Sequence, residues 1–231
     1  MLMSMQNDLK DLKTRALILR RTNYGESDRI LNLITPVGKV SAMAKGVRKE
    51  KSKLAGKIEM FTLTEVNLHF GKSNLATLTG AKMVKFYANI LKDFERLELG
   101  ADFLKKINQV SENIETSEHF EILNQSLAAL DDGLDTKIVN TWFLFNLARV
   151  MGEQVNLYTD INGNKLDVGS KYVWDVNEKG LRLFSNGEID ANAIKIMRLM
   201  WTTDCDVIKR IKNIEVYMPE ILRIAKAINN L

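Results

Sequence analysis

The stretch Phe61–Phe70, FTLTEVNLHF, decides the fold of the first part of the chain. Its side chains alternate between two faces, and the polar residues after Gly71 lead into a second extended run, Leu75–Gly80. Period-two alternation on both sides of a short glycine-containing turn predicts an antiparallel hairpin.

Shorter apolar runs precede this hairpin and end in turn residues. The segment Thr35–Gly38, TPVG, is a tight-turn signal because proline presets φ and glycine tolerates a positive φ. The runs are Arg15–Arg20, Arg29–Ile34 and Val40–Ala44. Five short strands suit a small closed barrel, since closure removes exposed strand edges. We therefore expect an N-terminal extension at 1–13 and a five-stranded OB-type barrel at 14–86.

The periodicity becomes helical after Tyr87. Asp131-Asp132-Gly133 is typical of a helix end, and Pro219 suits the first turn of a last helix. Residues 156–188 are polar and rich in glycine, which predicts a small ribbon. The expected fold class is α+β multidomain: the OB-type barrel is followed by a mainly α-helical domain at 87–231 that carries the ribbon.

Charge divides the chain unevenly. Residues 1–80 hold 14 Lys and Arg against 7 Asp and Glu, whereas the remainder holds 19 against 22. A basic first part indicates that this part faces a polyanion.

Three features bear on the compartment. The longest apolar stretch, Ile138–Ala148, is shorter than the roughly 20 residues of a membrane span. The N-terminus reaches acidic residues before any apolar core, which argues against a secretory signal. The single Cys205 excludes an internal disulfide framework and multi-cysteine metal sites. We expect a cytoplasmic protein.

The densest basic segment is Ala44–Lys57, AKGVRKEKSKLAGK, in which six cations oppose Glu50 alone. Such a cluster follows a phosphate backbone, and release of counterions supplies the affinity. The predicted nucleic-acid-binding residues are Lys45, Arg48, Lys49, Lys51, Ser52, Lys53 and Lys57 of this segment, with Arg20, Arg29 and Lys39 of the strands. A solvated surface loop without a ligand is the alternative.

Aromatic residues are scarce before Phe86, where only Tyr24, Phe61 and Phe70 occur. Barrels that bind single strands by stacking use several exposed aromatics. We therefore expect contacts mainly to phosphates, which would leave base edges free to pair with a second strand.

Catalytic interpretations find little support. Glu26 and Asp28 have no further metal ligands nearby and fit turn formation or barrel-closing salt bridges. Lys45 precedes Gly46-Val47-Arg48, which differs from the lysine motif of nucleotidyl transferases. His69 and His119 have no partner at ligand or triad spacing. The prediction is a protein without a catalytic site.

The run Ala16–Ile30, ALILRRTNYGESDRI, continues into Leu33–Arg48, LITPVGKVSAMAKGVR. The elements YGESDRIL, TP-x-GK and AKG-x-R resemble, in order and spacing, the opening of the RecO family of bacterial recombination mediators. The resemblance covers residues 14–80 and rests afterwards on helical character and length. It implies binding of single- and double-stranded DNA, strand annealing, and cooperation with RecR in loading RecA onto DNA covered by single-stranded-DNA-binding protein, at the nucleoid.

Many RecO proteins carry a four-cysteine zinc ribbon after a helix that ends in glycine. Here Thr159 and Asn162 stand at the first cysteine pair, and the later pair is missing near Phe184–Gly187. Because neutral Thr and Asn cannot replace thiolates around zinc, we expect no metal cofactor. The ribbon would persist by packing, with Trp174 and Phe184 as an apolar plug, or be loosely ordered.

The resemblance also implies that the helical domain binds the acidic, hydrophobic tail of single-stranded-DNA-binding protein. Such a tail needs an apolar groove with a nearby cation, and Arg149 is the candidate. Two rival functions stay open. One is an OB-fold module that binds RNA, and the other is a protein-interaction scaffold whose basic loop meets an acidic partner.

Overall fold

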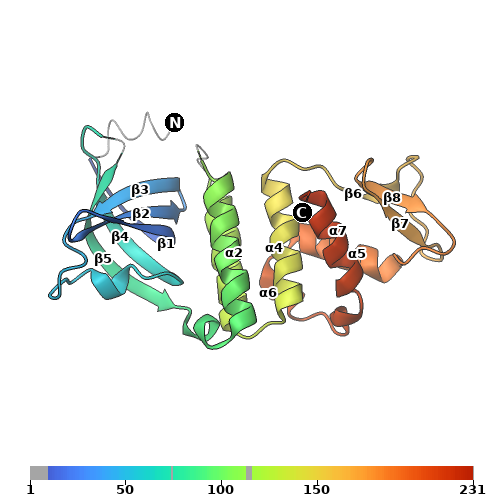
Figure 1. Ribbon diagram of the computed structural model, residues 1–231. Helices are drawn as coiled ribbons and strands as arrows, with labels where there is room; N and C mark the ends of the chain where they lie inside the picture. Colours follow the sequence, from blue (N-terminus) through green and yellow to red (C-terminus); the bar gives the residue numbers. More distant parts are fainter. Residues whose placement is uncertain (1–9, 74, 113–115, 231) are drawn as a thin grey trace. The chain divides into compact units, whose positions relative to one another are not determined.

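The computed structural model describes residues 10–73, 75–112 and 116–230 (Figure 1). The chain divides into two compact units, residues 1–132 and 133–231. The first unit therefore continues past the barrel and includes helices that the sequence analysis grouped with the helical domain. Among the described helices, none is long and apolar enough to cross a membrane.

Five strands of the first unit close into a barrel in the order β1-β2-β3-β5-β4. They are β1 (Asp11–Tyr24), β2 (Asp28–Thr35), β3 (Gly38–Ala44), β4 (Thr62–His69) and β5 (Ala76–Phe86). β1 closes the barrel by pairing with β4 through its first half and with β2 through its second half. The predicted strands are thus present, and β1 begins earlier than expected, at Asp11.

Strand alternation places the barrel core. Leu31 and Leu33 of β2, and Val66 and Leu68 of β4, are almost fully buried, whereas the intervening Asn67 is exposed. The period-two pattern read from the sequence therefore corresponds to an apolar interior and a polar outer surface.

The first unit continues with η2 (Ala88–Lys92), α2 (Phe94–Val110) and α3 (Glu118–Asp131). Several contacts connect these helices to the barrel. Gly100 of α2 lies against Phe61, and a Cβ at this glycine would lie 2.9 Å from the Phe61 ring. The Arg15 guanidinium lies 5.8 Å from the centre of the Phe120 ring.

The second unit contains helices and a three-stranded sheet in the order β6-β8-β7. Its elements are α4 (Thr136–Val150), β6 (Asn156–Asp160), β7 (Tyr172–Asp175), β8 (Gly180–Leu183), α5 (Ala191–Thr202), α6 (Cys205–Ile208), η3 (Ile214–Val216) and α7 (Met218–Ile228). α4 is buried on all sides from Thr141 to Ala148 and packs against α5 and α7. Pro219 lies in the first turn of α7, as predicted.

Candidate nucleic-acid interface

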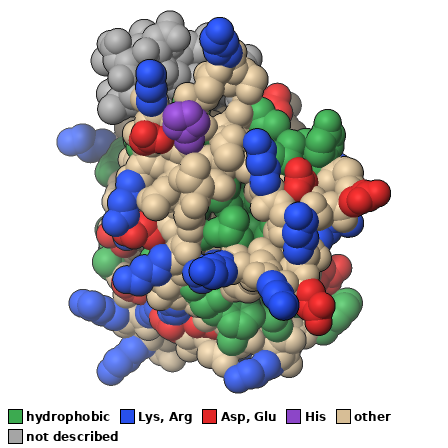
Figure 2. Space-filling model, turned by 90° about the vertical axis from the view of Figure 1, so that its left-hand side faces the viewer, with side chains coloured by type: hydrophobic (Ala, Val, Ile, Leu, Met, Phe, Trp, Pro, Cys, Tyr) green, Lys and Arg blue, Asp and Glu red, His purple; other side chains and the backbone are tan. Residues whose placement is uncertain are grey.

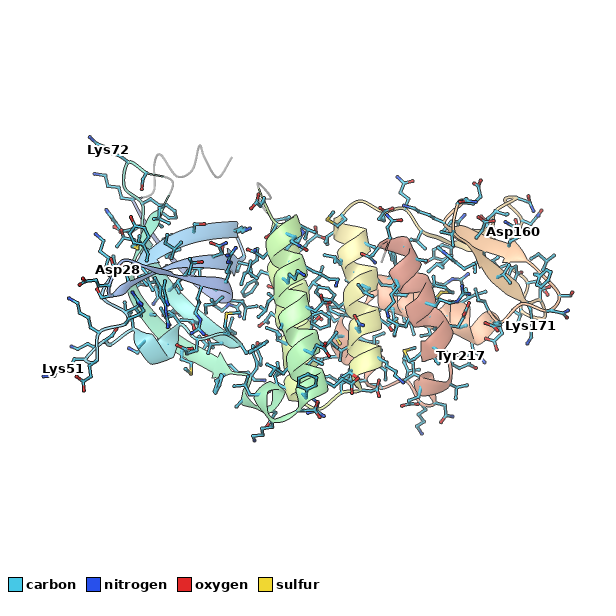
Figure 3. All side chains as sticks on the ribbon, in the orientation of Figure 1. Asp28, Lys51, Lys72, Asp160, Lys171 and Tyr217 are labelled. Carbon is cyan, nitrogen blue, oxygen red and sulfur yellow. The ribbon has the colours of Figure 1, made fainter. Side chains whose placement is uncertain are left out.

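The basic segment forms the connection between β3 and β4, which includes η1 (Ala55–Lys57). All six of its cations are exposed: Lys45, Arg48, Lys49, Lys51, Lys53 and Lys57. Lys51 projects outward from the barrel in Figure 3. Figure 2 shows many lysine and arginine side chains spread over this end of the barrel unit. The loop thus presents a set of charges that a polyanion can reach.

Asp28, at the start of β2, ties this loop to the barrel. Its Oδ1 accepts hydrogen bonds from the Gly46 backbone N–H at 2.6 Å and from the Ser27 hydroxyl at 3.2 Å. The Gly46 bond is the main cause that lowers the pKa of Asp28, and Lys45 and Lys49 lower it further. An ionised acceptor therefore fixes the root of the loop.

Arg48 adds a second connection to the same turn. Its backbone N–H donates to the Ser27 carbonyl oxygen at 2.8 Å, and its guanidinium donates to the Gly25 carbonyl oxygen. Gly25 and Gly46 have φ values of 55° and 62°, a left-handed conformation that glycine adopts at little cost. The YGES and AKG-x-R elements of the sequence thus form one connected substructure.

Ser52 serves the loop itself. Its hydroxyl oxygen accepts from the Leu54 N–H at 3.3 Å, and its own N–H donates to the Lys49 carbonyl oxygen at 3.0 Å. The serine is half-buried. Its position indicates a turn-stabilising role beside the phosphate contact predicted from the sequence.

The three strand cations differ in their surroundings. Arg20 is exposed. Arg29 donates from Nε to Asn23 Oδ1 at 3.1 Å and lies 3.7 Å from Glu59 Oε1. Arg29 is therefore held by protein partners, which sets it apart from the exposed cations of the loop.

Lys39 is the least accessible of the predicted cations, with 11% of its side chain exposed. Its ammonium donates to the Asn108 carbonyl oxygen at 2.7 Å and lies 3.3 Å from Glu112 Oε1. Asn108 lies in the last turn of α2, where backbone carbonyls lack helical partners. Lys39 thus joins the barrel to α2, and the candidate interface does not include it.

Three partly or largely exposed apolar side chains of the adjacent strands are not among the predicted site residues. Tyr24, at the end of β1, is 55% exposed, and Ile30 and Met43 are half-exposed neighbours on β2 and β3. Such a surface can pack against bases, although one aromatic makes only a small stacking platform. Its signal in the sequence was Tyr24 within YGESDR.

Lys72 is a further cation that the sequence analysis did not select. It is exposed on the β4–β5 turn and projects outward from the barrel (Figure 3). A lysine next to Gly71 in a short hairpin turn was the available signal.

No catalytic arrangement is visible among the residues that the structure describes. His69 Nδ1 lies 2.8 Å from Asp11 Oδ1 at the surface. His119 is buried, and neither of its ring nitrogens has a hydrogen-bond partner in this part of the chain. Burial raises the pKa of the Cys205 thiol to about 12, which makes it unreactive. The described His, Cys, Asp and Glu side chains form no group of three or more that could hold a metal.

Known proteins similar to this chain identify the family. The family model described as "Recombination protein O N terminal" matches residues 5–87. A DNA repair protein RecO from Dehalococcoides mccartyi is 30% identical over 210 residues, which cover 87% of this chain and 83% of the relative. The chain belongs to the RecO family. The RecO protein of a second strain of this species is 34% identical over 157 residues, which cover 67% of this chain and 62% of that relative. The RecO protein of Bacillus cytotoxicus is 25% identical over 213 residues, or 88% of this chain and 84% of the relative.

The side chains at the ribbon's cysteine positions do not fit a zinc ion. Thr159 Oγ1 accepts a hydrogen bond from Asn156 Nδ2 at 2.6 Å, and neutral oxygen donors are poor substitutes for thiolates. A Cβ at Gly187 would lie 2.2 Å from the Tyr172 carbonyl oxygen, so no larger residue fits there. These contacts lie where the family resemblance predicts cysteines.

Asp160 organises the first turn of the ribbon. Its Oδ1 accepts from the backbone N–H groups of Asn162 and Asn164 at 2.9 and 2.8 Å, and its Oδ2 accepts from Asn164 Nδ2 at 3.1 Å. The bonds from Asn164 are the largest cause that lowers the pKa of Asp160. Asn162, one of the cysteine positions, therefore contributes a backbone donor to this turn.

A cation from α5 holds β6 in place. The Arg198 guanidinium donates through Nε and Nη2 to the Leu157 carbonyl oxygen at 2.9 and 2.7 Å, and lies 4.6 Å from the centre of the Tyr158 ring. Trp174 is buried, as expected of an apolar plug, but Phe184 is 51% exposed. The prediction that Phe184 belongs to the plug is therefore wrong, because it lies beyond the end of β8 and faces solvent.

Arg149, the candidate for binding a partner's tail, is exposed in the last turn of α4. One surface depression of the second unit, of about 440 Å³, lies elsewhere. Its lining residues are Glu188, Ala193, Val216, Tyr217, Pro219, Glu220 and Arg223. Its lining includes two carboxylates, and Arg223 is ion-paired with one of them, Glu220, so the depression differs from the predicted apolar groove with a nearby cation at Arg149.

Proposed function

We propose that this RecO-family chain binds single-stranded DNA through the β3–β4 loop and pairs complementary strands without a catalytic step. The observation that carries the proposal is the set of six exposed cations on a loop whose root is fixed by Asp28. A fixed loop root reduces the entropy that the loop backbone loses when its cations meet phosphates.

Membership of the RecO family supports a role in DNA repair and recombination. The barrel's strand order and its β1–β4 closure agree with an OB-type barrel, whose β2–β3 face and β1–β2 and β4–β5 loops bind oligonucleotides in other proteins. The β3–β4 loop of this chain is bonded to the β1–β2 turn through Arg48. In the proposed pathway the chain also binds double-stranded DNA and acts at the nucleoid in the cytoplasm. There it works with RecR to load RecA onto strands coated by single-stranded-DNA-binding protein, whose tail would contact the second unit near Arg149.

The composition of the surface favours phosphate contacts over base readout. Tyr24 is the only aromatic on the described barrel strands that is more than half exposed. Phosphate contacts carry no sequence information and leave the base edges available. A strand bound in this way can pair with its complement while its charge is partly neutralised.

The first test removes loop charge and leaves the fold intact. We expect the variant with Lys45, Lys49, Lys51 and Lys53 replaced by glutamine to bind single-stranded DNA far more weakly, equally for unrelated base sequences. The log–log salt slope should flatten by about 0.7 for each phosphate that the variant no longer neutralises. Arg48 is left in place because its guanidinium bonds Gly25. Fluorescence anisotropy over a salt series measures both quantities.

A control variant removes the same charge elsewhere. Lys137, Lys165, Lys171 and Lys195 are exposed in the second unit, and their replacement by glutamine should leave the slope unchanged. If the loop variant kept its melting curve and its slope, the polyanion site would lie elsewhere.

The second test measures annealing of complementary oligonucleotides, bare and coated with single-stranded-DNA-binding protein. We expect acceleration in both cases, and a parallel decrease in the loop variant. A preference for RNA without annealing would support the RNA-binding alternative. Salt-resistant binding of protein without DNA affinity would support the scaffold alternative.

A further inference from the structure

The second half of β5 is a strand edge. β5 pairs with β4 along its length, but with β3 only at Ala76 and Thr77. Among the described residues, the backbone of Leu78–Phe86 makes hydrogen bonds only to β4. Alternate residues of an edge strand direct their N–H and C=O groups away from the paired neighbour. The β5 edge, Leu78–Phe86, therefore offers a row of backbone donors and acceptors.

The side chains of this edge are partly apolar. Met83, Val84 and Phe86 are 38%, 53% and 42% exposed. Soluble proteins usually protect an edge with charges and bulges, and β5 has both, in Lys82 and in the register shift opposite Leu63 and Thr64. These protective features do not explain why three large apolar side chains are exposed within the four residues 83–86.

The charges along the β5 edge indicate whether a second copy of the chain or an acidic partner segment can bind there. Lys82 is exposed and makes no ion pair in the part of the chain that the structure describes. Lys85 is exposed and lies 3.6 Å from Asp131 Oδ2. Lys57, the exposed last residue of η1, lies on an element adjacent to β5. Two copies paired edge to edge would bring these lysines together, which is unfavourable. An acidic segment would meet complementary charge.

We propose that the β5 edge binds an extended segment of a partner protein in which apolar residues alternate with Asp or Glu. The segment adds to the barrel as a further strand, so that backbone bonds supply affinity and Lys82 selects acidic side chains. This proposal does not rest on DNA binding, and it concerns a surface distinct from the loop cations Lys45–Lys53.

The probe is a fluorescein-labelled ten-residue peptide in which valine and aspartate alternate, added to the full chain. We expect a saturable rise in anisotropy. The same peptide N-methylated at alternate residues should bind at least about tenfold more weakly, because it lacks the N–H donors of one edge. A peptide with lysine in place of aspartate should not bind. Equal binding of the N-methylated peptide would show attraction by charge alone and overturn the proposal, as would no saturable signal.

Two variants locate the site. Val84→Pro removes one N–H at the bulge, where the β4 ladder is already irregular, and should weaken peptide binding. Lys82→Gln should weaken binding about two- to fivefold, the range for an exposed ion pair, whereas Lys72→Gln on the nearby hairpin turn should not. Circular dichroism checks that each variant folds. If Lys82→Gln and Lys72→Gln weakened binding equally, or if sedimentation showed dimers that Val84→Pro dissociates, the acidic-strand assignment would be wrong.

Discussion

The basic loop of the barrel and the ribbon of the second unit are both irregular segments organised around one aspartate. Asp28 accepts from Gly46 and Ser27, and Asp160 accepts from two backbone amides and the Asn164 side chain. In both cases these bonds lower the pKa of the carboxyl. The surroundings differ: cations point into water around Asp28, whereas Asp160 is 6% exposed within its own turn. The same device thus fixes the root of the basic loop in the first unit and the first turn of the ribbon in the second.

The largest expected effect on stability comes from Asp160→Ala. The substitution leaves two backbone amides and one side-chain amide without their acceptor, a carboxylate that is itself only 6% exposed, and the loss of these bonds destabilises the turn. We expect the melting midpoint of the second unit to fall by several degrees. All three tryptophans, Trp142, Trp174 and Trp201, lie in this unit, so their fluorescence reports its unfolding.

Asp160→Asn is the matched variant, because an amide keeps one acceptor oxygen and the shape of the side chain. Its melting midpoint should lie between those of the wild type and Asp160→Ala. Identical melting of all three proteins would mean that the ribbon does not depend on this carboxylate, and the comparison with Asp28 would fail.

Asp28→Ala should have a smaller effect on stability and a clear one on binding. Removal of the acceptor for the Gly46 N–H frees the root of the loop, so we expect single-stranded DNA affinity to fall severalfold even though a negative charge is also removed. Tryptophan fluorescence, which follows the second unit, should melt as in the wild type.

Glu26→Ala is the control for Asp28→Ala, since it removes the same charge from an exposed neighbour in the same turn. Charge alone predicts that both variants bind DNA slightly more tightly. If Asp28→Ala bound as tightly as Glu26→Ala, then fixing the loop root would contribute nothing to affinity.

The sequence was sufficient where the signal is local. Alternation in Phe61–Phe70 predicted the barrel hairpin, and the density of lysines predicted the exposed loop. It did not show that Lys39 and Arg29 have protein partners, because Asn108 and Glu59 are distant along the chain and the fold alone brings them together. Nothing in the sequence distinguishes Lys39 and Arg29 from the exposed cations of the basic loop.

The same limit explains the missed binding and packing features. The open edge of β5 depends on where β3 stops pairing, which alternation in β5 does not encode. Phe184 was predicted to be buried because it is aromatic, yet β8 ends at Leu183 and leaves it in solvent. Asp160 was overlooked because its role comes from backbone amides, which every sequence contains.

A third prediction concerns the pH dependence of stability, which should differ between the two units. Burial lowers the pKa of His119, so the folded first unit binds this proton less readily than the unfolded chain, whose histidine titrates near 6.5. Stability should therefore be complete above about pH 6.5 and decline as the pH falls below it. The depressed carboxyl pKa values of Asp28 and Asp160 act only at lower pH, below about 4.

His119→Leu should remove the decline that begins below about pH 6.5 and stabilise the first unit by about 1 kcal/mol at pH 7, because it removes two buried nitrogens that have no hydrogen-bond partner among the described residues. Calorimetry and far-ultraviolet circular dichroism follow this unit, which has no tryptophan. His69→Leu, at the surface, is the control and should keep the pH dependence. An unchanged profile in His119→Leu would assign the acid sensitivity to another group.

The smallest expected effect is that of a chelator, and it tests the ribbon side of the comparison most directly. Zinc-dependent ribbons lose stability without metal because the metal supplies folding free energy. Here Thr159 is bonded to Asn156, Gly187 has no room for a cysteine side chain, and Asp160 already has its donors. We therefore expect EDTA to leave the tryptophan-monitored melting midpoint unchanged, and elemental analysis of protein purified without chelator to find far less than one zinc per chain. Stoichiometric zinc, or a midpoint that EDTA lowers and zinc restores, would show that other side chains bind metal and that the Asp160 turn does not replace it.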